Sequence, residues 1–321
     1  MKRLIRILIV AAAALVVIAG ISLIMFFRQY PHVAAAPVLH VDRSAQRVER
    51  GRYLANHVTV CIDCHSTRDW SYFSGPVMPG TEGRGGEMFD ARYGFPGTFY
   101  ASNITPTGIG NWSDGEILRT ITSGVTNSGR AMFPVMPYLS YSNLSEEDAE
   151  AIVAYLRTLK PIEGSYPAAR LDFPMSLIVR TIPRQYMPHA APGKSDGLAY
   201  GKYLTTIAGC AECHTQQVKG APVAGMEFAG GFAFALPSGG TVKSANITPD
   251  MKTGIGNWSR GAFIFRFQYY QGDIESTKIA PGKFNTIMPW TMYAGMTDED
   301  LGAIYDYLRT VKPVANNVTT F

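Results

Sequence analysis

Two five-residue stretches of the same pattern constrain this chain more than any other feature. Residues 61–65 read Cys-Ile-Asp-Cys-His, and residues 210–214 read Cys-Ala-Glu-Cys-His. The two thiols of such a stretch can bond to the vinyl groups of a haem, and the adjacent imidazole can ligate its iron. Each stretch therefore predicts a covalent c-type haem site. The candidate residues are Cys61, Cys64 and His65 in the first stretch and Cys210, Cys213 and His214 in the second.

Three other uses of paired cysteines compete with this interpretation. They are a zinc site built from both pairs, a redox dithiol, and structural disulfides. Zinc does not require a histidine directly after each pair, a dithiol does not require two copies, and a disulfide between such close cysteines closes almost no loop. The chain has 4 cysteines, all within the two stretches. We therefore expect two covalently bound haem c groups.

Composition excludes some classes of protein. The chain has 321 residues, 46% of them hydrophobic and 17% charged, which suits two ordinary domains rather than a disordered protein. Its formal net charge of +4 comes from Lys2, Arg3, Arg6 and Arg28, which precede the first acidic residue, Asp42. The rest of the chain carries equal numbers of basic and acidic side chains. A nucleic-acid surface needs clustered Lys and Arg, so no nucleic-acid partner is expected.

The N-terminal segment predicts export. Residues 7–27 carry no charge and are long enough to span a bilayer as one helix. The three cations before this segment favour a cytoplasmic N-terminus, so the rest of the chain is expected on the outer side of the membrane. A cleaved signal peptide is the alternative, with Ala34-Ala35-Ala36 as a processing site. The apolar segment exceeds the usual length of such peptides, which favours a retained anchor.

The rest of the chain contains an internal repeat. The segment GRYLANHVTVCIDCH, starting at Gly51, corresponds to GKYLTTIAGCAECH at Gly201, and the second copy is one residue shorter. Each copy continues with Asn-Ile-Thr-Pro, then Gly-Ile-Gly-Asn-Trp, then Met-Pro, then Tyr-Leu-Arg-Thr-x-Lys-Pro. The predicted organisation is an anchor at 1–29, a tether at 30–44, a first domain at 45–162, a linker at 163–195 and a second domain at 196–318.

Each copy is expected to close with an amphipathic helix. Ser145 and Thr297 precede these helices as N-caps, with an aspartate three residues later as in a capping box. Pro161 and Pro313 are expected to stop them. The glycine of each Gly-x-Tyr-Leu would let the closing helix cross the opening helix at short range. The linker, which includes the apolar stretch LDFPMSLIVRTIP, is expected to pack across both domains, with a partner-binding or membrane-surface role as the alternative.

The sixth iron ligand has to come from outside the Cys-x-x-Cys-His stretches. Met136 and Met288 stand at matched places in the two copies, each directly before a proline. A thioether opposite histidine is a common haem arrangement that raises the reduction potential, so we expect these two as axial ligands. Met132 and Met292 compete locally but have no counterpart in the other copy. A methionine that only fills the core is the remaining alternative.

The ordered motifs resemble class I cytochrome c domains. More narrowly, the chain is similar to the multihaem cytochrome c subunits of membrane-bound alcohol and gluconate dehydrogenases, although those carry three haem domains. The resemblance implies an all-α fold of two tandem class I cytochrome c domains after the transmembrane helix. It also implies that Asn103–Pro106 and Asn246–Pro249 line the haem edge, with Trp112 and Trp258 near the propionates; turn and core roles for these residues are the alternative.

These expectations define a function. If histidine and methionine occupy both axial positions, neither iron has an open site, and each can only gain or lose an electron. We therefore expect a dihaem electron carrier on the periplasmic side of a bacterial cytoplasmic membrane. It would work between a dehydrogenase or quinol-linked donor and a respiratory acceptor, most simply with no enzyme activity of its own. The alternative is a dihaem redox enzyme, a peroxidase or a sulfur-compound oxidoreductase, with one open iron.

Overall fold

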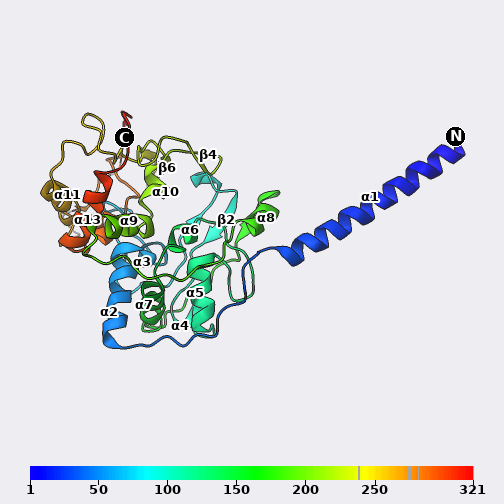
Figure 1. The fold of residues 1–321 in the computed structure, drawn as a ribbon, viewed down its shortest axis with the longest axis horizontal. Coiled ribbons are helices and arrows are strands. Elements are labelled where there is room, and N and C mark those ends of the chain that lie inside the picture. The colour runs from blue at the N-terminus through cyan, green and yellow to red at the C-terminus, as the bar shows by residue number, and fades with distance from the viewer. Residues whose placement is uncertain (238, 273–276, 281, 321) are drawn as a thin grey trace.

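The computed structural model of the chain describes residues 1–237, 239–272, 277–280 and 282–320. Helix α1 (Lys2–Gln29) extends away from the rest of the molecule, as Figure 1 shows. None of its residues is buried. It is long and apolar enough to cross a membrane, a test that an N-terminal signal sequence also passes.

The body contains two repeat units, which we call the first unit (45–162) and the second unit (196–318). Each has an opening helix, a short helix with the cysteines, a helix after the Asn-Ile-Thr-Pro stretch, a short helix after the Met-Pro pair, and a closing helix (Figure 1). In the first unit these are α2 (Ala45–Tyr53), α3 (Cys61–Cys64), α5 (Asp114–Ser123), α6 (Tyr138–Tyr141) and α7 (Glu146–Leu156), with the one-turn helix α4 (Pro106–Ile109) before α5. In the second they are α9 (Gly197–Ile207), α10 (Cys210–His214), α11 (Arg260–Gln268), α12 (Trp290–Tyr293) and α13 (Asp298–Leu308).

The expectation of an all-α fold is incomplete, because short antiparallel strands accompany the helices. One sheet has the order β1-β2-β3, and two hairpins pair β4 with β5 and β6 with β7. The strands have two to four residues each, too few for a readable alternation of polar and apolar side chains. They are β1 (Met88–Phe89), β2 (Gly97–Tyr100), β3 (Arg170–Leu171), β4 (Gln217–Val218), β5 (Ala221–Pro222), β6 (Ala233–Ala235) and β7 (Thr241–Lys243).

The opening and closing helices cross closely, as expected. A Cβ atom at Gly51 would overlap the carbonyl oxygen of Ala151 in α7, and one at Gly201 would overlap that of Ala303 in α13. These crossings bury the apolar faces of both helix pairs. Leu54 and Ile152 in the first unit and Leu204 and Leu301 in the second are fully buried. The closing helices end at Leu156 and Leu308, before the prolines that were expected to stop them.

The extra residue of the first unit is accommodated in a π-helical turn, η1 (Leu54–Val58), that directly continues α2. The corresponding part of α9 is ordinary α-helix to Ile207. A π-bulge is the usual way for an α-helix to absorb one inserted residue. The bulge presents His57 to the second unit, where its Nδ1 lies 2.8 Å from the carbonyl oxygen of Met292.

The linker packs across both units, as predicted. Its strand β3 pairs with β2 of the first unit, and its Tyr186 hydroxyl donates to the carbonyl of Leu144 at 2.9 Å. At its other end, Lys194 forms an ion pair with Glu299 of the second unit at 2.5 Å. The remaining linker elements are α8 (Met175–Ile178) and the 3-10 turn η3 (Val179–Thr181).

Candidate functional site

The two cysteine-bearing helices begin in the same unusual way. The residue before each helix has a left-handed backbone, Val60 with φ of 45° and Gly209 with φ of 67°. This turn ends the opening helix and starts a second helix at once, so both cysteines and the histidine follow on one short element. The four thiols are half-buried and unpaired. Each stretch can therefore present two sulfurs and an imidazole together.

The thiols do not suit the dithiol or zinc alternatives. Burial raises the pKa of Cys210 and Cys213 to about 12, whereas a redox dithiol requires a lowered thiol pKa. Among the described residues, no three His, Cys, Asp or Glu side chains gather in a metal-binding cluster. The protonated, partly enclosed thiols suit attachment to an apolar group that would cover them.

Both histidines are oriented by the backbone. His65 Nδ1 lies 2.6 Å from the carbonyl oxygen of Ser102, and His214 Nδ1 lies 2.7 Å from that of Ala245. A carbonyl accepts only from a protonated nitrogen, so this bond fixes the proton on Nδ1 and leaves the Nε2 lone pair free to bind a metal. Burial lowers the pKa of both imidazoles below the ordinary 6.5, and the carbonyl bond opposes that shift. The neutral form that ligates iron is thus favoured in both units.

The Met-Pro segments are tied to the cysteine helices. The helix after each pair carries a buried tyrosine whose hydroxyl donates to the carbonyl two residues before the first cysteine. Tyr141 donates to Thr59 at 2.6 Å, and Tyr293 donates to Ala208 at 2.7 Å. Met136 and Met288 therefore belong to turns anchored beside their own cysteine helices. The residues present fit a covalently attached haem in each unit.

Met132 and Met292, the alternative candidates for the sixth ligand, lie in surroundings that do not match each other. The carbonyl oxygen of Met132 accepts from the Tyr138 hydroxyl at 3.2 Å, within the first unit. Met292 is a buried residue of α12 whose carbonyl faces His57. These contacts differ between the two units, whereas the amide two residues after Met136 and the amide two residues after Met288 donate in the same way to the methionine carbonyl, each at 2.7 Å.

The pKa of Tyr293 responds to titratable groups of both units. Burial raises the pKa of Tyr293 well above its ordinary value, and the thiols of Cys210, Cys213 and Cys64 raise it further. This tyrosine therefore lies within reach of both cysteine helices. A direct bond also joins the units here, from the Ser140 hydroxyl to the Glu212 carboxylate at 2.7 Å.

The Asn-Ile-Thr-Pro stretches act as structural turns. The Asn103 side-chain oxygen accepts from the amide and hydroxyl of Thr105 at 2.9 and 2.7 Å, and its nitrogen donates to the Ile162 carbonyl at 2.8 Å. Asn246 makes the same bonds to Thr248 and to Val314. These buried side chains fasten the segment that follows the closing helix. The observed bonding gives these asparagines and threonines a structural role in the turn, and a haem-edge role for the stretches stays a prediction.

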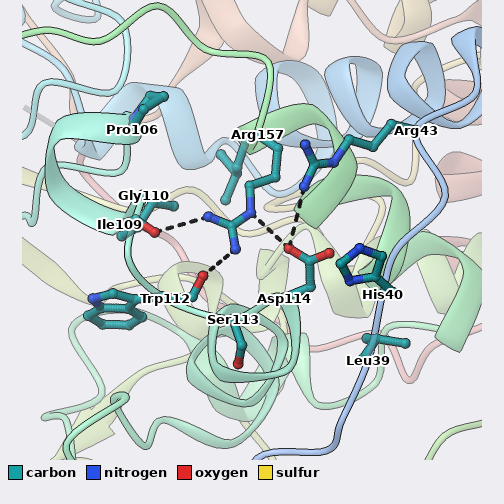
Figure 2. A pocket seen from close by; sticks show the side chains of 11 residues that line it. Leu39, His40, Arg43, Pro106, Ile109, Gly110, Trp112, Ser113, Asp114 and Arg157 are labelled. Atoms are coloured by element: carbon teal, nitrogen blue, oxygen red, sulfur yellow. Dashed lines mark hydrogen bonds and ion pairs between the residues drawn. The ribbon is translucent and has the colours of Figure 1, made fainter.

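Trp112 lies at a surface hollow of the first unit that Figure 2 shows in close-up. Arg157 crosses this hollow, donating to Asp114 at 2.8 Å and to the carbonyl oxygens of Ile109, at 3.0 Å, and Trp112 (Figure 2). Arg309 donates to the corresponding loop of the second unit, to the carbonyl oxygens of Gly256 at 2.6 Å and of Ile255 at 3.5 Å. The arginine of each Tyr-Leu-Arg-Thr thus clamps the preceding loop. Trp258, which is 38% exposed, lines a separate surface hollow beside α11.

One charged cluster escaped sequence reasoning. Arg68 lies between two carboxylates, donating to Asp63 at 2.7 Å and to Glu87. The side chains of Arg68 and Asp63 are 7% and 4% exposed. Burial raises the pKa of Asp63 to about 6, although Arg68 opposes that shift. In the second unit the corresponding Glu212 is exposed, and Gln217 stands at the place of Arg68. The arginine in the first copy, opposite a glutamine in the second, was the signal available in the sequence.

Comparison with known proteins gives these features a context. Residues 198–312 match the family model described as Cytochrome c. The chain is 28% identical over 291 residues to the alcohol dehydrogenase (quinone) cytochrome c subunit of Gluconacetobacter polyoxogenes, covering 85% of this chain and 58% of that protein. It is 29% identical over 308 residues to the fructose dehydrogenase cytochrome subunit of Gluconobacter japonicus, covering 90% and 58%.

A further relative has a length closer to that of this chain. A diheme cytochrome c-type protein of Cereibacter sphaeroides is 28% identical over 266 residues, covering 79% of this chain and 82% of that protein. The chain spans a little over half the length of the dehydrogenase subunits that it matches. It therefore contains a cytochrome c domain at residues 198–312 and is related over most of its length to the cytochrome c subunits of alcohol and fructose dehydrogenases.

Proposed function

We propose that this chain is a dihaem c-type cytochrome that transfers electrons at the outer face of the cytoplasmic membrane. The first unit, 45–162, and the second unit, 196–318, are then two tandem cytochrome c domains. The observation that carries the proposal is the repeated arrangement of two thiols and a carbonyl-oriented histidine beside a Met-Pro turn. Haem c bound there would supply one-electron redox chemistry.

Each side chain has a stated role in this proposal. Cys61 and Cys64, and likewise Cys210 and Cys213, anchor the porphyrin covalently. His65 and His214 ligate from one side through Nε2, held in that tautomer by the carbonyls of Ser102 and Ala245. Met136 and Met288 would hold the iron as its second protein ligand in each unit and would so exclude oxygen, peroxide and other small ligands.

The partners and location are part of the same proposal. Relatives named as cytochrome subunits of alcohol and fructose dehydrogenases support a dehydrogenase, or another quinol-linked system, as the donor and a respiratory component as the acceptor. Helix α1, about 42 Å long at 1.5 Å per residue, suits a retained single-pass anchor. Arg28 and Tyr30, at its end toward the body, suit the membrane interface.

Ligand binding distinguishes this carrier from a dihaem enzyme with an open iron. The full-length protein, purified in mild detergent and reduced, would be exposed to carbon monoxide while its absorbance spectrum is recorded. We expect no spectral change, because the methionines close both sites. Binding of carbon monoxide to one haem per chain would favour the dihaem enzyme instead. Parallel purification under gentle conditions should retain a dehydrogenase subunit with its own redox cofactor.

A further inference from the structure

A loop of the first unit, residues 70–75, packs against the Met-Pro segment of the second unit. The backbone of Phe73 donates to the carbonyl of Thr277 at 2.9 Å, and that of Ile279 donates to the carbonyl of Ser71 at 2.9 Å. Between these bonds, Tyr72 and Lys278 form an antiparallel bridge. The loop therefore adds a short strand-like contact to the segment that leads to Met288.

Ser74 bonds directly to the backbone on either side of Pro289. Its side chain is fully buried, and its hydroxyl donates to the carbonyl of Met288 at 2.5 Å while accepting from the amide of Trp290 at 2.9 Å. Its own amide donates to the side-chain oxygen of Asn285 at 2.9 Å. One serine of the first unit thus holds the backbone on both sides of the Met288-Pro pair.

Asn285 completes the link from the second unit. It is 1% exposed, and its side-chain nitrogen lies 3.3 Å from the carbonyl oxygens of both Trp70 and Tyr72. Its oxygen also accepts from the amide of Thr286 at 2.7 Å. Ser74 has φ of 68°, a left-handed conformation that a non-glycine residue adopts at some cost. The buried, satisfied polar network offsets that cost and fixes the loop in one position.

The first unit holds its own methionine differently. The amide of Tyr138 donates to Met136, its hydroxyl donates to Met132, and the amide of Met132 donates to Gly124, all within the first unit. The described bonds around Met136 therefore do not need the second unit. The backbone around Met288 is therefore held by a residue of the other unit, whereas the described bonds around Met136 come from its own unit.

We propose that Ser74 is a positioning residue for Met288, so that axial ligation in the second unit depends on the first unit. This inference rests on the proposed ligation by His214 and Met288. Loss of the Ser74 hydroxyl removes one bond from the carbonyl of Met288 and one from the amide of Trp290, and leaves only the bond between these two groups, at 2.7 Å, to hold this turn. The Met288 side chain then leaves the iron more readily, although residue 74 belongs to the other repeat.

The test uses the full-length oxidised protein in detergent and measures displacement of methionine by added imidazole, followed by loss of the methionine-to-iron charge-transfer band. Ser74→Ala should accelerate displacement at one of the two sites by about five- to tenfold, as expected for the loss of a buried hydrogen bond. Ser71→Ala is the matched control. Its hydroxyl, on an exposed residue, donates to Asp69 directly before the loop, so displacement should be unchanged.

Two more variants keep the outcomes distinct. Met288→Ala should remove about half of the charge-transfer band. The kinetic phase of displacement that is lost with it then belongs to the second site. An unchanged band would refute the assignment of Met288 as a ligand. If Met288→Ala behaves as expected but Ser74→Ala matches Ser71→Ala, the positioning role is wrong and the ligand assignment stands. Ser74→Gly also lacks the hydroxyl but tolerates the left-handed backbone, so it should reproduce the faster displacement even if Ser74→Ala folds poorly.

Discussion

At the scale of single residues, the chain controls the backbone just before each cysteine pair. Val60 and Gly209 occupy the same left-handed position, and only the second is a glycine. Val60 is half-buried against the core, and this packing offsets the cost of a left-handed backbone at a residue with a side chain. Gly209 has no Cβ atom and does not incur that cost. The turn sets the direction of the cysteine helix and therefore of the thiols and the imidazole.

Gly209→Ala tests this turn. An added Cβ would meet only the Cγ of Glu212 at 3.7 Å, so the cost arises from the backbone conformation and not from crowding. We expect a loss of about 1–2 kcal/mol in the free energy of unfolding, measured by chemical denaturation. Gly197→Ala, at the open N-terminal turn of α9, is the control and should be neutral or slightly stabilising. Equal effects of the two substitutions would rule out a role for the left-handed turn.

At the scale of elements, each unit depends on the crossing of its opening and closing helices. The crossing brings Gly51 against α7 and Gly201 against α13 so closely that no side chain fits. It also places the cysteine helix, which directly follows the opening helix, in a fixed relation to the helix after the Met-Pro pair. The residues that we propose to bind haem in one unit thereby depend on the packing of this pair of helices.

Gly201→Ala should break this crossing in the second unit. The new methyl group would overlap the Ala303 carbonyl, and α9 and α13 would have to separate. We expect a loss of about 3 kcal/mol or more and poor haem incorporation at Cys210 and Cys213. Gly261→Ala in α11, where a Cβ would meet nothing within 4 Å, should be tolerated. A stable, fully haem-loaded Gly201→Ala protein would contradict the account of the crossing.

At the scale of the whole molecule, the two units cap each other's closing helices. Ser145 accepts from the amide of Asp148 as an N-cap should, but the amide of Ser145 donates to the hydroxyl of Tyr203 from the second unit. Tyr203 in turn donates to the Asp148 carboxylate at 2.6 Å. Tyr53 of the first unit bonds in the same way to Thr297 and Asp300. The interface is therefore reciprocal, and the units assemble as a pseudo-symmetric pair.

Tyr203→Phe removes one half of this reciprocal contact. The Asp148 carboxylate loses a buried charged hydrogen bond, which is worth about 1.5–3 kcal/mol. Urea denaturation followed by circular dichroism should show this loss, with the two units unfolding less cooperatively. Tyr155→Phe is the control, because that hydroxyl bonds to Asn56 within the first unit. If both substitutions destabilise the protein equally, the bond between the units contributes no more to the free energy of unfolding than a bond within one unit.

The sequence predicted the local features well and the contacts between units poorly. The capping residues and the close glycine crossing follow from motifs of a few residues, and the repeat made each of them visible twice. The tyrosine bridges join residues 55 and 247 positions apart, and nothing in the local pattern marks them. The acidic partners of Arg68 were also not predicted, because Asp63 lies in α3 and Glu87 lies directly before β1, and folding of the first unit brings them together. Packing of the two units decided the tyrosine contacts.

The central claim is that both cysteine stretches carry haem, and intact mass spectrometry of the denatured full-length protein tests it most directly. Covalently attached haem remains on the chain after unfolding. We predict two haems on the unmodified protein and one haem on each of two variants, Cys61→Ser with Cys64→Ser and Cys210→Ser with Cys213→Ser. A single haem on the unmodified protein, or two haems on either variant, would contradict the account.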